Sequence, residues 1–169
     1  MIISENISIE KAWKLLEDIY DPEIPVLSIT DLGIVRDVKI ATSTSGEKTL
    51  EIAITPTYSG CPAIDVIVFN IRMALLQSGF KSGKIIQQLL PAWTTDWITE
   101  KGKEKLKAYG IAPPVGKSFD KIYLEELEVE CPLCRSKNTR LISQFGSTAC
   151  KALYQCNDCK EPFDYFKCH

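Results

Sequence analysis

Two Cys-x-x-Cys pairs near the end of the chain constrain its fold more than any other feature of the sequence. They are Cys131/Cys134 and Cys156/Cys159, and the 21 residues between them are enough for a strand, a turn and a returning strand. Four thiolates at this spacing are typical of the closed tetrahedral site of a zinc ribbon. The sequence therefore predicts one structural zinc ion held by these four cysteines.

Two other interpretations of the same cysteines remain open. A rubredoxin-like iron site uses the same cage of four sulfurs, although closed sites of this spacing usually hold zinc. Disulfide bonds would require an oxidising compartment. The first residues of the chain lack the basic and apolar regions of a signal peptide, which favours metal binding over disulfides.

The distribution of cysteines also predicts how the chain divides into domains. Six of the seven cysteines follow residue 130. A segment of about 40 residues rarely buries enough apolar surface to fold alone, and a bound metal is a common remedy. The sequence predicts a first domain at 1–110, a linker at 111–128 rich in proline and glycine, and the zinc ribbon at 129–169.

The charge of the chain argues against several classes of partner. The net charge is −2, which gives no basic field to attract nucleic acid. Residues 129–169 carry six Lys or Arg against four Asp or Glu, and four thiolates with one Zn²⁺ would neutralise that excess. No apolar run approaches the ~18 residues that cross a bilayer. We expect a protein of the reducing cytoplasm that binds neither nucleic acid nor membranes.

Hydrophobic periodicity predicts a small α+β domain before the ribbon. Apolar residues at helical spacing indicate a helix at 9–20, with Ser8 as its N-cap. Alternating residues, clearest at Leu50, Ile52 and Ile54, indicate strands. The fold class is thus α+β, with a three-stranded sheet, packed helices and a C-terminal zinc ribbon. The predicted strands are 34–41, 49–55 and 84–90, and the further helices are 62–78 and 95–109.

The helix predicted at 62–78 is apolar on more than one side. Ile64, Ile67, Val68, Ile71 and Leu75 form one stripe. A second set, Val66, Phe69, Met73 and Leu76, spreads around the rest of the cylinder. Such a helix is either buried on most sides or forms an interface, so a homodimer through this helix is a further expectation.

Cys61, directly before that helix, allows two interpretations. Unsatisfied amides and the helix dipole favour a thiolate at such a position, which makes Cys61 a candidate reactive or metal-binding thiol. The preceding loop adds hydroxyl groups at Thr55 and Thr57, and Gly60 permits a close turn. The alternative is a buried cysteine that packs as a small apolar residue.

Hydrolytic and nucleotide-driven chemistry is not indicated. A Cys/His enzyme needs a base beside its nucleophile, and the single histidine is the terminal residue His169. There is no phosphate-binding glycine loop. Asp21 and Glu23 are candidate acidic partners that could hold iron transiently with Cys61; alternatively, Asp21 fixes a turn and Glu23 is solvated.

Three segments resemble the metal–sulfur cluster assembly family. They are DPEIPV at 21–26, DLGIVR at 31–36 and TPTYSGCP at 55–62. Three others resemble one branch of that family, the D component of bacterial phenylacetyl-CoA epoxidase systems, which carries an appended zinc ribbon. These are PAWTTDW at 91–97, YGIAPP at 109–114 and FGSTACKALY at 145–154.

The resemblance implies an accessory role in phenylacetate degradation. In that system, other subunits supply a di-iron oxygenase and a flavin/iron–sulfur reductase that epoxidise the ring of phenylacetyl-CoA. This chain would mature or maintain a metal centre of such a partner, or be a stoichiometric structural subunit. The family's distinctive cysteine corresponds to Cys61 and its acidic loop to Asp21 and Glu23. Transient iron or an iron–sulfur cluster at Cys61 is the second cofactor expected.

Overall fold

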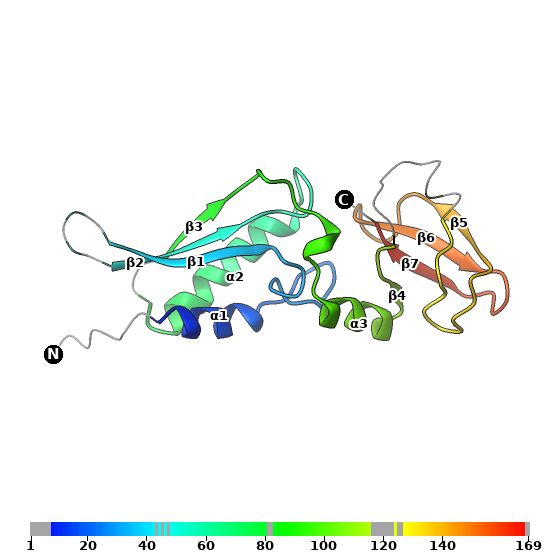
Figure 1. Ribbon diagram of the computed structural model, residues 1–169, viewed down its shortest axis with the longest axis horizontal. Helices are drawn as coiled ribbons and strands as arrows, with labels where there is room; N and C mark the ends of the chain where they lie inside the picture. The colour runs from blue at the N-terminus through cyan, green and yellow to red at the C-terminus, as the bar shows by residue number, and fades with distance from the viewer. Residues whose placement is uncertain are drawn as a thin grey trace. The chain divides into compact units, whose positions relative to one another are not determined.

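A computed structural model describes residues 8–42, 44, 46, 48–80, 83–115, 124 and 127–167 (Figure 1). The chain forms two compact units, residues 1–93 and 94–169. His169, most of the predicted linker and parts of the 42–48 loop lie outside the described residues. Each unit is considered by itself below.

The first unit contains the predicted three-stranded sheet. Its strands are β1 (Val35–Thr42), β2 (Lys48–Ile54) and β3 (Gly83–Gln87), in the order β1-β2-β3. β1 and β2 form an antiparallel hairpin. β3 runs parallel to β2, which requires the crossover that helix α2 (Ala63–Gln77) supplies.

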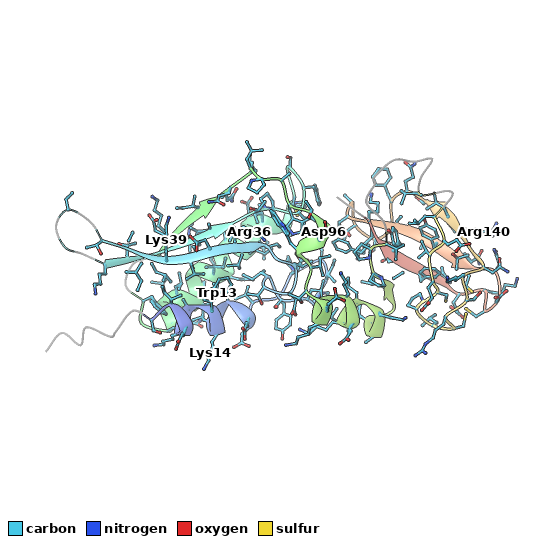
Figure 2. All side chains as sticks on the ribbon, in the orientation of Figure 1. Trp13, Lys14, Arg36, Lys39, Asp96 and Arg140 are labelled. Carbon is cyan, nitrogen blue, oxygen red and sulfur yellow. The ribbon has the colours of Figure 1, made fainter. Side chains whose placement is uncertain are left out.

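One face of this sheet is covered and the other is open. Helices α1 (Ile9–Glu17) and α2 lie on the same side of the sheet (Figure 1). Leu50, Ile52 and Ile54 are all fully buried, as the alternating pattern of β2 predicts. On the opposite face, Glu51 pairs with Lys39 at 3.6 Å and Lys84 at 3.3 Å. Figure 2 shows Lys39 on the side of the sheet away from α1.

Helix α1 ends three residues earlier than the predicted limit at residue 20. Ser8 caps its N-terminus, as expected, by accepting a hydrogen bond from the Lys11 amide. The helix stops at Glu17 because the following segment forms turns held by other partners. The Asp21 amide donates to the Leu27 carbonyl and the Ile29 amide donates to the Ile19 carbonyl.

The second unit contains a four-stranded sheet in the order β4-β7-β6-β5. Strands β5 (Thr139–Ser143), β6 (Lys151–Cys156) and β7 (Pro162–Phe166) form the antiparallel ribbon. The short strand β4 (Ile111–Ala112) pairs in parallel with β7, within the region predicted as a linker. The predicted fold class, an α+β domain followed by a ribbon, is confirmed.

The helix predicted at 95–109 is divided in two. A single 3-10 turn, η1 (Thr95–Trp97), precedes helix α3 (Glu100–Tyr109). The break occurs because Thr99 caps α3, accepting a hydrogen bond from the Gly102 amide at 3.0 Å. Gly110, with φ of 91°, ends α3 in the left-handed conformation that glycine adopts readily. The domain limits at 110 and 128 remain a prediction, and α3 and β4 belong to the second compact unit.

Candidate functional site

The four cysteines of the two Cys-x-x-Cys pairs lie together in the second unit. Their Sγ atoms are all within 4.8 Å of one another. The Sγ atoms of Cys131 and Cys159 are 3.8 Å apart, and those of Cys134 and Cys156 are 3.5 Å apart. A tetrahedral zinc with Zn–S bonds of about 2.3 Å requires sulfurs about 3.8 Å apart. The four thiols therefore fit a tetrahedral zinc ion, and the six described cysteines form no disulfide.

The backbone presents the two pairs in the same way. The Arg135 amide donates to the Cys131 carbonyl at 2.9 Å, and the Lys160 amide donates to the Cys156 carbonyl at 3.1 Å. Arg135 and Lys160 follow the second cysteine of each pair and have φ of 65° and 68°. Glycine would adopt this left-handed conformation with less strain. Each pair thus forms a tight turn that directs both sulfurs to one point.

The protonation of the thiols also suits a metal site. The Cys159 amide, which donates to the Cys156 Sγ at 3.5 Å, is the main cause that lowers the pKa of Cys156 to about 7. The Glu161 amide lowers the pKa of Cys159, but burial and the neighbouring thiols raise it to a net value of about 12. Four thiolates cannot share this space without a cation, whereas a bound metal ion would hold all four deprotonated.

A polar network joins the turns that carry the cysteines. The Asp158 carboxylate accepts hydrogen bonds from the Ser136 hydroxyl and, at 2.9 Å, from the Asn138 side-chain amide. The Ser136 bond is the largest cause that holds the pKa of Asp158 below its ordinary value. Asn157 donates to the Asn138 side chain at 2.9 Å. The spacing of the cysteines does not reveal this network, because its members come from turns about 20 residues apart.

The cysteine cluster rests on an apolar core. Tyr154 is 1% exposed and its ring stacks on Phe163 at 6.0 Å between centroids. Its hydroxyl donates to the Leu124 carbonyl. β4 contributes to the same core through Ala112, so the ribbon buries more apolar surface than its last 40 residues alone provide. The buried residues are Ala112, Leu124, Val129, Cys131, Ala152, Tyr154, Cys156, Phe163 and Tyr165.

Cys61 lies in the first unit, one residue before Pro62, the N-cap of α2. It is 8% exposed. Its amide donates to the Tyr58 carbonyl and its carbonyl accepts from the Ile64 amide, both at 3.3 Å. Gly60 has φ of 81°, and a Cβ atom added there would meet open space. Glycine is therefore favoured at this position by the backbone conformation and not by crowding. The loop thus fixes Cys61 at the N-terminal end of a 15-residue helix.

Thr55 occupies the start of the same loop. It is 2% exposed, and its amide donates to the Ile34 carbonyl at 2.9 Å. Its side-chain hydroxyl is buried and has no hydrogen-bond partner among the residues that the structure describes. An unpaired buried hydroxyl is costly and calls for an explanation such as a ligand that it contacts. Thr57, the second predicted hydroxyl, is half-buried.

Asp21 and Glu23 occupy a turn earlier in the first unit. Asp21 is 6% exposed, and its Oδ1 accepts hydrogen bonds from the Glu23 amide at 2.8 Å and the Ile24 amide at 2.9 Å. This carboxylate therefore stabilises the turn. Glu23 is half-buried. Within the described ranges, the ribbon cysteines are the only set of three or more Cys, His, Asp or Glu side chains close enough to share a metal ion, so Cys61, Asp21 and Glu23 do not form such a set.

The family models match both units. Residues 9–84 match the model described as iron-sulfur cluster assembly protein, and residues 117–167 match the PaaD zinc beta ribbon domain. Fold and site therefore define a class: an iron–sulfur cluster assembly domain joined to a zinc ribbon. No helix in the described part of the chain is long and apolar enough to cross a membrane.

Comparison with individual proteins identifies the family within this class. The chain is 54% identical over 160 residues, 95% of its length and 93% of the relative's, to an Escherichia coli K12 protein that is named as the D component of 1,2-phenylacetyl-CoA epoxidase. The chain belongs to this family of epoxidase D components.

More distant relatives match a little over half of the chain. The Fe-S protein maturation auxiliary factor of Porphyromonas gingivalis is 32% identical over 98 residues, 57% of this chain and 89% of that protein. The crystal structure of a domain of unknown function, DUF59, from Bacillus anthracis has a TM-score of 0.51 at 25% identity and covers 58% of this chain and 90% of its own.

Proposed function

We propose that this protein is an accessory component of a bacterial phenylacetyl-CoA ring-epoxidising oxygenase, and that it matures or maintains the iron or iron–sulfur centre of a partner subunit. The observation that carries this proposal is the 54% identity, over 95% of the chain, to a protein named as the D component of that epoxidase. Similarity of 57% of the chain to a protein named as an Fe-S protein maturation auxiliary factor supports the metal-related role. The protein would act in the reducing cytoplasm, where free thiols persist.

Cys61 is the residue that we assign to handling iron. It lies one residue before Pro62, the N-cap of α2, and cysteine sulfur is a typical ligand of iron–sulfur clusters. Iron is the cargo: the Cys61 thiol loses a proton as its sulfur binds the metal, and regains one when a ligand of the client replaces it, with no electron transferred. The Thr55 hydroxyl, buried without a partner among the described residues, would contact a ligand of that cargo. Thr57, Asp21 and Glu23 would guide its approach.

The zinc ribbon has a separate role in this proposal. Cys131, Cys134, Cys156 and Cys159 would hold one structural zinc ion, which stabilises the second unit and takes no part in transfer. The ribbon would dock the client, either the oxygenase or the reductase subunit. Within the ribbon, Phe145 is 63% exposed and Ile142 is 47% exposed, and both offer apolar contacts.

The test compares two cysteine variants of the full chain. Cys61→Ser should lower the iron content of the co-expressed client without unfolding this protein. Cys150→Ser is the matched control, because Cys150 is also a buried cysteine without a disulfide, 4% exposed, and is neither Cys61 nor one of the four clustered cysteines. Metal and sulfide content, a visible spectrum and growth on phenylacetate are measured on material purified without oxygen. A fully loaded client with normal growth in Cys61→Ser would contradict the maturation role.

The second candidate is a stoichiometric structural subunit in which Cys61 only packs. The burial of Cys61, 8% exposed, favours it. It predicts stable co-purification with the oxygenase at a fixed ratio and no response to Cys61→Ser. An active oxygenase purified without this protein would exclude it.

A further inference from the structure

Helix α2 carries an apolar stripe that the described residues leave uncovered. Val66, Phe69, Met73 and Leu76 are exposed by 45, 60, 39 and 62%. Their spacing of three, four and three residues places them on one side of the helix, and we name them the α2 stripe. The buried side of α2 is a different set, Ala63, Ile67, Ile71 and Leu75.

The composition of α2 marks this side as a contact surface. Asp65 and Arg72 are the only charged residues among the 15 of Ala63–Gln77. A helix side that faces water normally carries several charges, whereas depletion of charge around large apolar residues is typical of the centre of an interface. Contiguous apolar surface of this kind usually marks a binding site.

We propose that the α2 stripe joins two copies of this chain, packed as antiparallel helices about a two-fold axis at the level of Ile71. The stripe is symmetric about that residue: Val66 and Leu76 lie five positions on either side of it, and Phe69 and Met73 lie two. Antiparallel packing therefore brings Val66 against Leu76 of the second copy and Phe69 against Met73 of the second copy. These pairs satisfy the condition of a two-fold contact, in which the same surface is used on both copies and each contact occurs twice.

The flanks of the stripe are compatible with the same arrangement. Asp65 and Arg72 are seven positions apart and lie on one flank, and the uncharged Asn70 and Gln77 lie on the other. A two-fold axis perpendicular to the helices places each flank against the same flank of the second copy. The charged flank carries one charge of each sign, so the contact has no net charge. Arg72 lies one position from the axis and therefore near Arg72 of the second copy, whereas Asp65 of the second copy is level with Gln77, five positions from Arg72.

The apolar area of the α2 stripe sets the expected affinity of the dimer. Four side chains of these types, exposed by about half, present on the order of 400 Å² per copy. The contact would bury about 800 Å² from the stripe, and about 1,000 Å² with the flanking polar residues, which is the lower end for specific complexes. We therefore expect a reversible dimer that dissociates in the range of about 10 to 100 µM.

The experiment is sedimentation velocity of the full chain over a wide concentration range, for the wild type and two leucine variants. Leu76→Glu places a charge in the stripe. Leu89→Glu is the matched control, because Leu89 is 61% exposed in the same unit but outside α2. Circular dichroism verifies that both variants fold. We expect the wild type and Leu89→Glu to dimerise equally, and Leu76→Glu to weaken dimerisation by more than about tenfold.

Three results would overturn the proposal. The first is a wild type that stays monomeric at several hundred micromolar, in which case the second unit of the same chain or another protein covers the stripe. The second is a dimer that Leu76→Glu leaves intact. The third concerns orientation: a chain with Val66→Cys and Leu76→Cys should give an intermolecular disulfide between positions 66 and 76 under mild oxidation, and mass spectrometry that finds 66 joined only to 66 would exclude the antiparallel contact.

Discussion

Tyr154 makes the stability of the ribbon depend on alkaline pH in a way that one substitution can isolate. Its phenol is buried at 1% exposure, and burial raises its pKa to about 12 from the ordinary 10. The folded protein therefore favours the protonated phenol. The buried phenol therefore contributes to the free energy of unfolding in full below pH 10, where it is neutral in both the folded and the unfolded state. This contribution is lost as the pH rises to about 12, because the phenol ionises first in the unfolded chain.

The magnitude follows from the two pKa values. A difference of about two in pKa corresponds to about 2.7 kcal/mol lost from the free energy of unfolding between pH 10 and 12. Tyr154→Phe removes this loss. At neutral pH the same variant loses the hydrogen bond to the Leu124 carbonyl, which costs about 1–2 kcal/mol. The variant should therefore be less stable than the wild type at pH 8 and should become the more stable of the two above about pH 11.

The assay is urea unfolding of the full chain at steps of pH from about 8 to 12. Unfolding is monitored by the near-ultraviolet circular dichroism of tyrosine. Tyr109→Phe is the control, because Tyr109 lies in the same unit but its side chain is 56% exposed. Titration of the other ionisable groups cancels in the difference between each variant and the wild type. A deficit of Tyr154→Phe that is the same at pH 8 and at pH 11.5 would refute the reasoning.

Three further predictions concern other parts of the molecule. Cys156→Ser should abolish stoichiometric zinc, measured by mass spectrometry of the metal, and should expose the ribbon amides to hydrogen exchange while the first unit keeps its protection; retention of zinc would contradict the four-thiolate site. Lys160→Gly should raise the free energy of unfolding of the ribbon by about 0.5–1 kcal/mol, because relief of the left-handed φ of 68° exceeds the entropy that glycine adds to the unfolded chain. Urea midpoints of variant and wild type test this, and an unchanged midpoint would count against strain at Lys160. Ile71→Ala, at a fully buried position, should cost about 2–5 kcal/mol in thermal or urea unfolding, whereas Phe69→Ala on the exposed side should change stability by less than about 0.5 kcal/mol in dilute solution.

Local patterns account for what the sequence predicted correctly. The four ribbon cysteines are recognisable because each pair is a short-range motif with one geometric solution. Strand β2 follows from the alternation of Leu50, Ile52 and Ile54. Both signals depend on residues within a few positions of each other. Strand β3 shows no such alternation and ends at Gln87, three residues before the predicted limit of 90.

The features that the sequence did not predict depend on pairing between residues far apart in the chain. β4 has only two residues, and its hydrogen bonds go to β7, where Ile111 is opposite Asp164. The surrounding glycine and prolines indicate a linker, and no pattern within 111–128 shows the distant partner. The bonds among Ser136, Asn138 and Asp158 likewise join separate turns. Whether Cys61 and Asp21 meet likewise depends on contacts across 40 positions, and within the described residues they do not form a metal-sized set with Glu23.

The two left-handed residues beside the cysteine cluster have an electrostatic consequence. A zinc ion with four thiolates carries a net charge of −2. Arg135 and Lys160 stand where glycine would suit the backbone best, and each brings one positive charge. The chain thus accepts backbone strain at two points and obtains two counter-charges beside a dianionic centre. With both replaced by glycine, the turns would be more relaxed, but the cluster would expose an unscreened field that repels other anions and strengthens its response to ionic strength.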